Sequence, residues 1–231
     1  MADLGIAAAE YGVFLFSTVC HEASHAWMAG QLGDDTAAQG GQVSLNPVPH
    51  IRREPVGMVL VPLIGLATGG YVMGWASTPF NRAWAQEHPR RAAAMALAGP
   101  LANLALVLAS VVLMRVGLDT GMLRTADAAG LYHVVLPAPG QPDWVGPAAV
   151  LLSLCFSLNL VLFFFNLLPV GPLDGAAALG LVPGLDRVGA WLRSARFRLI
   201  GLVLAWTLFP HLYGPVYVGC LNLVFPGAGY H

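Results

Sequence analysis

Long apolar stretches alternate with shorter polar or proline- and glycine-rich connections along this chain. Four stretches, 4–32, 90–116, 145–168 and 199–225, are each long enough to cross a hydrocarbon core of about 30 Å as a helix. Pro210, Gly214 and Pro215 interrupt the last one, so 199–225 is either one kinked span or a span followed by an interfacial helix. The pattern predicts an all-α polytopic membrane protein with about four to five transmembrane helices.

The segment 40–81, which follows the first predicted helix, has a different pattern. Polar and apolar residues alternate over 42–45, which is typical of a short strand, and the apolar run 56–72 is broken by Pro62 and by glycines. Irregular backbone at membrane depth must be buried in protein or line a wet cavity. We therefore expect a short re-entrant β/loop segment here rather than a further span.

Composition agrees with a bilayer as the main solvent. Hydrophobic residues make up 57% of the 231 residues and charged residues only 10%, and the mean hydropathy is +0.67. These values exclude an ordinary water-soluble enzyme, and a net charge of -1 leaves no cationic surface for nucleic acid. We expect a single membrane-embedded domain over 1–231 whose first apolar stretch is retained, because no basic residue precedes it as in a cleaved signal peptide.

Arginine placement predicts an orientation. The connection after the first helix and the one after the third are rich in arginine, whereas the second is poor; the arginines are Arg52, Arg53, Arg82, Arg90 and Arg91 in the first, Arg115 and Arg124 around the second, and Arg187, Arg193, Arg196 and Arg198 after the third. Cytoplasmic loops retain an excess of basic residues. We expect the N-terminus outside and the first and third connections in the cytoplasm, provided that 56–72 does not cross.

The strongest chemical signal is the sequence His21-Glu22-Ala23-Ser24-His25 in the first helix. Histidines at i and i+4 lie on one helix face, where both imidazoles can bind one metal ion, and the intervening glutamate can reach a water molecule on that ion. The alternative is a chance pattern on a helix face. Within a membrane, two histidines and a carboxylate are costly unless they are functional, so we favour a zinc site with Glu22 as general base and acid.

A catalytic zinc has three protein ligands and one open position. Asp174 follows the inner end of the third helix, and the predicted orientation places it on the same side of the membrane as the inner half of the first helix. Asp174 is therefore the candidate third ligand. The alternative is that Asp174-Gly175 forms an ordinary turn beside Pro172.

Taken together, these motifs resemble the site-2 protease family of intramembrane zinc metalloproteases. The matching pieces occur in the family's order over nearly the whole chain; they are His21-Glu22-Ala23-Ser24-His25, Ser44-Leu45-Asn46-Pro47 with His50-Ile51, Gly74-Trp75, Ala98-Gly99-Pro100-Leu101-Ala102-Asn103 and the stretch 166–175. Arg52 replaces an acidic residue that many relatives carry, and Ala176 replaces a second glycine after Asp174.

The resemblance implies one zinc per chain held by His21, His25 and Asp174, with Glu22 as the catalytic acid and base. It also implies that Asn166 hydrogen-bonds the scissile carbonyl or its oxyanion, although Asn166 could equally pair with backbone near Pro169. His50 is expected to be a polar residue of the re-entrant segment rather than a ligand. Asn103 is expected to tie helices together.

The function that the resemblance implies is hydrolysis of peptide bonds in or near transmembrane segments of other membrane proteins. Such a substrate must be unwound, and residues 42–45 would hold it as an added strand. The site would face the cytoplasm. Two alternatives are a catalytically inactive membrane scaffold and a zinc or proton transporter that uses the same ligands. An intact Glu22 argues against the first, and clustering of the ionisable groups at one depth argues against the second.

Overall fold

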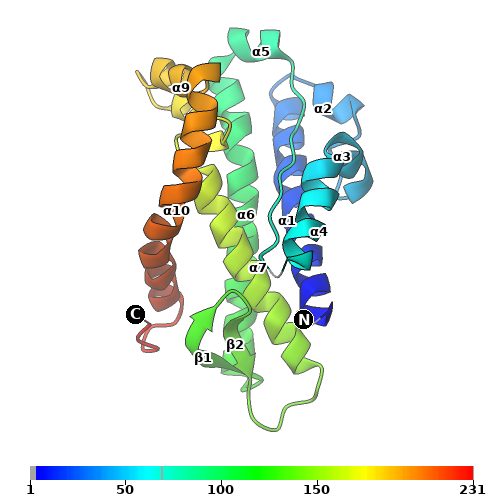
Figure 1. Cartoon of the computed structure of the whole chain (residues 1–231), viewed down its shortest axis with the longest axis vertical. Coiled ribbons are helices and arrows are strands. Elements are labelled where there is room, and N and C mark those ends of the chain that lie inside the picture. The colour runs from blue at the N-terminus through cyan, green and yellow to red at the C-terminus, as the bar shows by residue number, and fades with distance from the viewer. Residues whose placement is uncertain (1–3, 69, 231) are drawn as a thin grey trace.

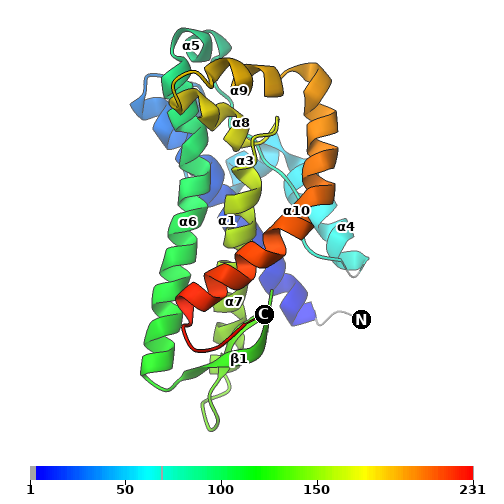
Figure 2. The ribbon, with the colours of Figure 1, turned by 90° about the vertical axis from the view of Figure 1, so that its left-hand side faces the viewer.

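Four long helices form the body of the computed structural model, which describes residues 4–68 and 70–230 (Figure 1). They are α1 (Leu4–Gln31), α6 (Pro89–Asp119), α7 (Val145–Asn166) and α10 (Ala195–Val224), and each contains a segment long and apolar enough to span a membrane. The chain is thus a multi-pass membrane protein, and the predicted fold class is confirmed. The last span is a single helix that continues through both of its prolines, and Figure 2 shows it changing direction along its length.

Short helices lie mainly in the connections at one end of this body. The first connection contains α2 (Thr36–Gln39), α3 (Pro47–Arg53), the π-helical turn η1 (Val56–Leu60), α4 (Val61–Ala67) and α5 (Arg82–Glu87). The third contains α8 (Asp174–Ala178), the 3-10 turn η2 (Leu179–Leu181) and α9 (Asp186–Leu192). In Figure 1, α5 and α9 lie at the end of the molecule opposite to both chain termini.

The segment between α2 and α5, where we expected a re-entrant β/loop segment, is largely helical. Its apolar helical part, Val56–Ala67, would extend only about 18 Å, which is too short to cross a bilayer. An extended stretch, residues 71–80, then returns alongside α1 to the end where the segment began (Figure 1). We call residues 71–80 the return strand, although they are not part of a sheet.

The strand that we expected at 42–45 does not form. Residues 43–45 form bends instead, because local hydrogen bonds take the place of pairing with another strand. The Asn46 side chain caps α3 by accepting from the N–H of Val48, and the Ser44 hydroxyl accepts from the N–H of Asn46. The role proposed for this stretch as an exposed edge for substrate therefore has no structural basis.

The β-structure of the described residues lies instead in the second connection. Strands β1 (Leu123–Gly130) and β2 (His133–Pro137) form an antiparallel hairpin with an irregularity between Thr125 and Gly130. The hydroxyl of Ser153, on α7, accepts hydrogen bonds from the N–H groups of Val134 and Val135. The sequence predicted only a polar linker here.

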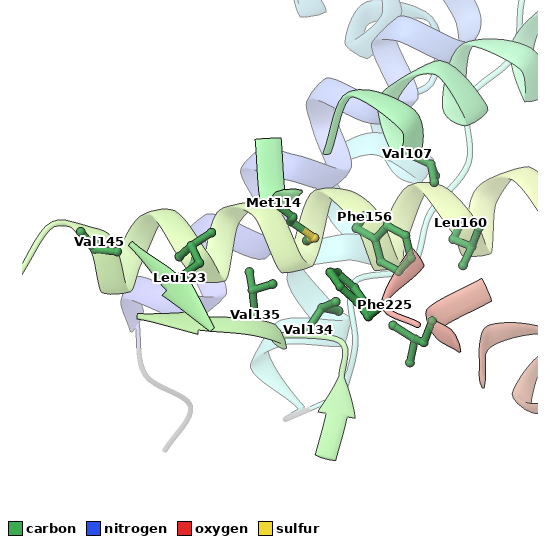
Figure 3. Packing of buried hydrophobic residues seen from close by; sticks show 11 residues of the cluster. Val107, Met114, Leu123, Val134, Val135, Val145, Phe156, Leu160 and Phe225 are labelled. Atoms are coloured by element: carbon green, nitrogen blue, oxygen red, sulfur yellow. The ribbon is translucent and has the colours of Figure 1, made fainter. Parts of the chain in front are cut away.

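The main hydrophobic core joins the hairpin to the helices (Figure 3). Its buried members include Met114 on α6, Phe156 on α7 and Val134 and Val135 on β2, with Phe225 just after α10. In the spans of α1, α6 and α7, 33 to 44% of the residues are buried, against 6% in α10. Most buried polar residues of the described chain lie on these three helices, and Asp34, Gln42 and His50 lie in the first connection.

Candidate metal centre

Two histidines of α1 form the centre of the site. His21 and His25 are 7% and 5% exposed, and the helical spacing places their Nε2 atoms 3.0 Å apart. Their rings lie nearly perpendicular, with centroids 4.6 Å apart. Both nitrogens thus point at one small region beside α1.

Asp174 reaches the same region from a distant part of the sequence. Helix α7 ends at Asn166, and the chain turns into α8, of which Asp174 is the first residue. Its Oδ2 lies 3.1 Å from Nε2 of His21 and 3.3 Å from Nε2 of His25. Gly175 permits this approach, since a Cβ there would lie 2.2 Å from the carbonyl oxygen of Leu167.

The other nitrogens of the two imidazoles are also engaged. Nδ1 of His21 lies 2.6 Å from Oδ1 of Asn103, and Nδ1 of His25 lies 2.8 Å from the carbonyl oxygen of Met95. These oxygens accept hydrogen bonds, so both Nδ1 atoms carry hydrogen and donate. In a neutral imidazole, each Nε2 then presents a lone pair, which is the form that binds metal.

The geometry of these atoms fits a metal ion. Two imidazole nitrogens and a carboxylate oxygen lie 3.0 to 3.3 Å from one another, so one cation between them would contact all three. Ligands of a tetrahedral zinc at about 2.0–2.1 Å are separated from one another by about 3.3 Å. The spacing of the three atoms is therefore close to that of one face of a zinc tetrahedron.

Gly99 keeps space open beside these ligands. A Cβ at this position of α6 would lie 2.3 Å from Nε2 of His25 and 2.5 Å from Nε2 of His21. Any side chain here would therefore occupy the space next to both metal-binding nitrogens. The short distance also shows how closely the α6 backbone approaches the site.

The electrostatics around Asp174 favour its ionised form. Burial by itself would raise the pKa of this carboxyl, but the imidazoles of His25 and His21, when protonated on Nε2, outweigh burial and hold the pKa well below its usual range. The carboxylate is thus available as a ligand at neutral pH.

Glu22 lies beside the histidines but has a different partner. One of its carboxylate oxygens and one nitrogen of each histidine lie within 4.8 Å of one another. Its Oε2 also lies 2.6 Å from the hydroxyl of Thr78, on the return strand, which donates to it. Glu22 thus lies near the two histidines, and a residue outside α1, Thr78, orients its carboxylate. By contrast, Asp174 directly contacts both Nε2 atoms.

The remaining sequence candidates lie outside this cluster. Asn166, at the end of α7, donates from Nδ2 to the carbonyl of Leu162. His50 is buried on α3 and bonds the carbonyl of Ser44; among contacts of the described residues, none joins it to the histidines of α1. Sequence reasoning missed Thr78 and the spatial role of Gly99, although the latter stood in a recognised motif.

A profile of peptidase family M50 matches residues 10–187, a stretch that contains both histidines, Glu22 and Asp174. The chain belongs to peptidase family M50. This confirms the resemblance to the site-2 proteases drawn from its motifs. Zinc is the cofactor of this family of metalloproteases, and His21, Glu22 and His25 carry the HExxH pattern in the M50 chain.

Two bacterial relatives extend the comparison. "Putative zinc metalloprotease YwhC" of Bacillus subtilis (strain 168) is 33% identical over 162 residues, which are 70% of the M50 chain and 63% of that protein. "Putative zinc metalloprotease Rip2" of Mycobacterium tuberculosis (strain ATCC 25618 / H37Rv) is 32% identical over 207 residues, which are 88% of the M50 chain and 70% of that protein. The chain thus matches less than two thirds of the length of YwhC. No solved structure matches it.

Proposed function

We propose that this protein is an intramembrane zinc metalloprotease that hydrolyses peptide bonds in or near transmembrane segments of other membrane proteins. The observation that carries the proposal is the convergence of His21, His25 and Asp174, all within or beside the membrane-spanning body, on one point. These residues would hold one zinc. A bound zinc would polarise a scissile carbonyl as a Lewis acid, and it would lower the pKa of bound water toward neutrality.

Glu22 would act as general base and then general acid. Its carboxylate is within reach of the centre, so it can take a proton from the attacking water and deliver it to the leaving amine. The hydrogen bond from Thr78 restrains the carboxylate while leaving its other oxygen to accept that proton. Glu22 is therefore assigned to proton transfer rather than to metal binding.

Asn166 would bind the substrate carbonyl or its oxyanion. One hydrogen of its amide is donated to the carbonyl of Leu162, which fixes the side chain, and the amide carries a second hydrogen. A preoriented donor of this kind stabilises charge as it develops on a carbonyl oxygen. In this assignment Asn166 contributes to the rate and not to zinc affinity.

We further propose that the site faces the cytoplasm. Arginines of α3, α5, the start of α6 and α9 lie toward the end of the molecule that contains α8, whereas Arg115, near the end of α6, and Arg124, on β1, belong to the opposite end (Figure 2). The positive-inside rule then orients the first end toward the cytoplasm. A fluorescent reporter inserted in the α8 to α9 loop should fold, whereas an alkaline phosphatase inserted after Gly140 should be active; the reverse result contradicts this orientation.

The function is tested with protein purified in detergent and a tagged single-span substrate. We expect about one zinc in the parent and in Glu22→Gln, but cleavage only by the parent, because the amide cannot accept the proton. Glu87→Gln, an exposed substitution in α5, is the matched control and should cleave normally. Absence of zinc from the parent, or equal turnover by Glu22→Gln, would overturn the proposal.

A further inference from the structure

A chain of buried side-chain amides connects the metal centre on α1 to α6 and α7. Asn103 on α6 and Asn159 on α7 are both completely buried, in spans that are otherwise apolar. Nδ2 of Asn103 donates to Oδ1 of Asn159 at 2.9 Å. Oδ1 of Asn103 accepts from Nδ1 of His21 at 2.6 Å. The chain therefore ends on a residue that would bind zinc.

The contacts of Asn159 determine the direction of each hydrogen bond between these side chains. Nδ2 of Asn159 lies 2.8 Å from the carbonyl oxygen of Cys155, which can only accept, and 2.9 Å from the hydroxyl of Ser17. The amide end of Asn159 must therefore face Cys155, which turns its oxygen toward Asn103. Asn103 must in turn present its NH₂ to Asn159 and its oxygen to His21. The hydrogen of His21 is consequently held on Nδ1.

We propose that Asn103, oriented by Asn159, is a positioning residue for the metal, because it fixes the His21 tautomer that leaves the Nε2 lone pair for zinc. The proposal rests on the function proposed above, and it assigns to Asn103 the orientation of a zinc ligand in that same site. Hydrogen bonds from a ligating imidazole to a neighbouring acceptor fix both tautomer and ring orientation. Here that acceptor has no freedom to flip, since α7 determines which way its amide points.

A purely structural role makes a different prediction. If Asn103 served only to tie α6 to α7, any substitution that breaks its bond to Asn159 would affect the fold, and zinc affinity would follow stability. If Asn103 acts on His21, affinity depends on an acceptor at this position whether or not the interhelical bond survives. The aspartate and leucine variants separate these two roles.

The experiment measures the zinc dissociation constant of the detergent-purified full chain by competition with a chelator, together with its thermal unfolding. Asn103→Leu removes the acceptor and should weaken zinc binding about 10 to 100-fold. Asn103→Asp keeps an acceptor for His21 but sets a carboxylate against Oδ1 of Asn159. It should bind zinc within about threefold of the parent while unfolding at a lower temperature.

Two further variants complete the set. Asn159→Leu frees the Asn103 amide to turn, so we expect a smaller loss of zinc affinity than in Asn103→Leu. Ser110→Ala removes a buried hydroxyl on α6 that bonds only within its own helix, and it should bind zinc like the parent. Cobalt bound in place of zinc should show an altered visible absorption spectrum in Asn103→Leu but not in Ser110→Ala.

Parental affinity in Asn103→Leu would overturn the inference, and so would equal losses in the aspartate and leucine variants. These outcomes are distinct from failure of the proposed function, in which the parent itself lacks zinc or does not cleave. A parent that binds zinc and cleaves, beside a leucine variant with unchanged affinity, would reject the role of Asn103 alone.

Discussion

The hydroxyl of Thr78 lies 2.6 Å from Oε2 of Glu22, so the return strand makes direct contact with the proposed catalytic carboxylate. The same strand is held at Val72 and Trp75, whose N–H groups donate to Glu10 and to the carbonyl of Gly57. These two bonds fix the strand on the N-terminal side of Thr78. Its contact gives the re-entrant segment a part in orienting Glu22.

Removing this hydroxyl should slow catalysis without removing the metal. We expect Thr78→Val to lower kcat about tenfold with zinc content and KM little changed, because one hydrogen bond to a charged group is lost. Thr78→Ser keeps the donor and should restore most of the rate. Thr68→Val, which removes an exposed hydroxyl bonded within α4, is the control. An unchanged kcat in Thr78→Val would show that the contact does not orient Glu22.

A methyl group at residue 99 should exclude zinc. Gly99→Ala places a Cβ within 2.5 Å of both Nε2 atoms, so we expect metal content to fall from about one per chain to nearly zero. Gly12→Ala on α1 has no atom within 4 Å of its added Cβ and should keep its zinc. Elemental analysis of the purified proteins measures the difference. Full zinc occupancy in Gly99→Ala would mean that the ion does not bind beside α6.

Loss of Asp174 should weaken zinc binding far more than loss of a similar acid nearby. Asp174→Ala leaves two protein ligands of the three, and we expect at least a hundredfold weaker binding and no cleavage. Asp186 also begins a short helix but is exposed, so Asp186→Ala should behave like the parent. In the parent, a chelator should abolish cleavage, and added zinc should restore it. Retention of tight binding by Asp174→Ala would exclude this residue as a ligand.

The far end of the return strand should contribute pH-dependent stability. Burial would raise the pKa of Asp34, but hydrogen bonds from the Thr36 hydroxyl and from the N–H groups of Asn81 and Thr36 outweigh it, so this pKa lies below its ordinary value. A lowered pKa in the folded state stabilises the protein above the unfolded-state pKa of about 3.9. That stabilisation is lost as the pH falls through the folded-state value.

We therefore expect Asp34→Asn to be about 1–3 kcal/mol less stable than the parent at pH 7, with the difference shrinking below pH 4. Unfolding in denaturant at several pH values measures it. Asp35→Asn, at an exposed neighbour, should have little effect at any of these pH values. A gap between parent and Asp34→Asn that stays constant down to pH 3 would contradict the assignment.

The parts of the site that the sequence predicted are those set by local geometry or by chain direction. Histidines four residues apart share a helix face, so the sequence predicted that His21 and His25 lie side by side, as they do in the structure. Asp174 was predicted from the number of spans, because the third span must end on the same side of the membrane as the half of α1 that carries the histidines. Run length alone located the four spans, since a bilayer demands about twenty apolar residues for each.

The parts that the sequence did not predict depend on long-range contacts. The alternation at 42–45 suggested a strand, but side-chain caps at Ser44 and Asn46 were stronger locally. The contact of Thr78 with Glu22 spans 56 residues and has no periodic signal. The expectation that Asn103 ties helices together is confirmed by its bond to Asn159, and Asn159 carries the same signal, because an amide in an apolar span is costly unless it is paired.

Asp174 is 153 residues beyond His21, and two complete spans lie between them. A growing chain therefore exposes its histidine pair to the translocation machinery long before the third ligand has been synthesised. Full metal coordination has to wait until α6 and α7 have entered the bilayer and α8 has emerged. In the proposed protease, this order of synthesis would delay hydrolytic activity until the enclosing helices are in place.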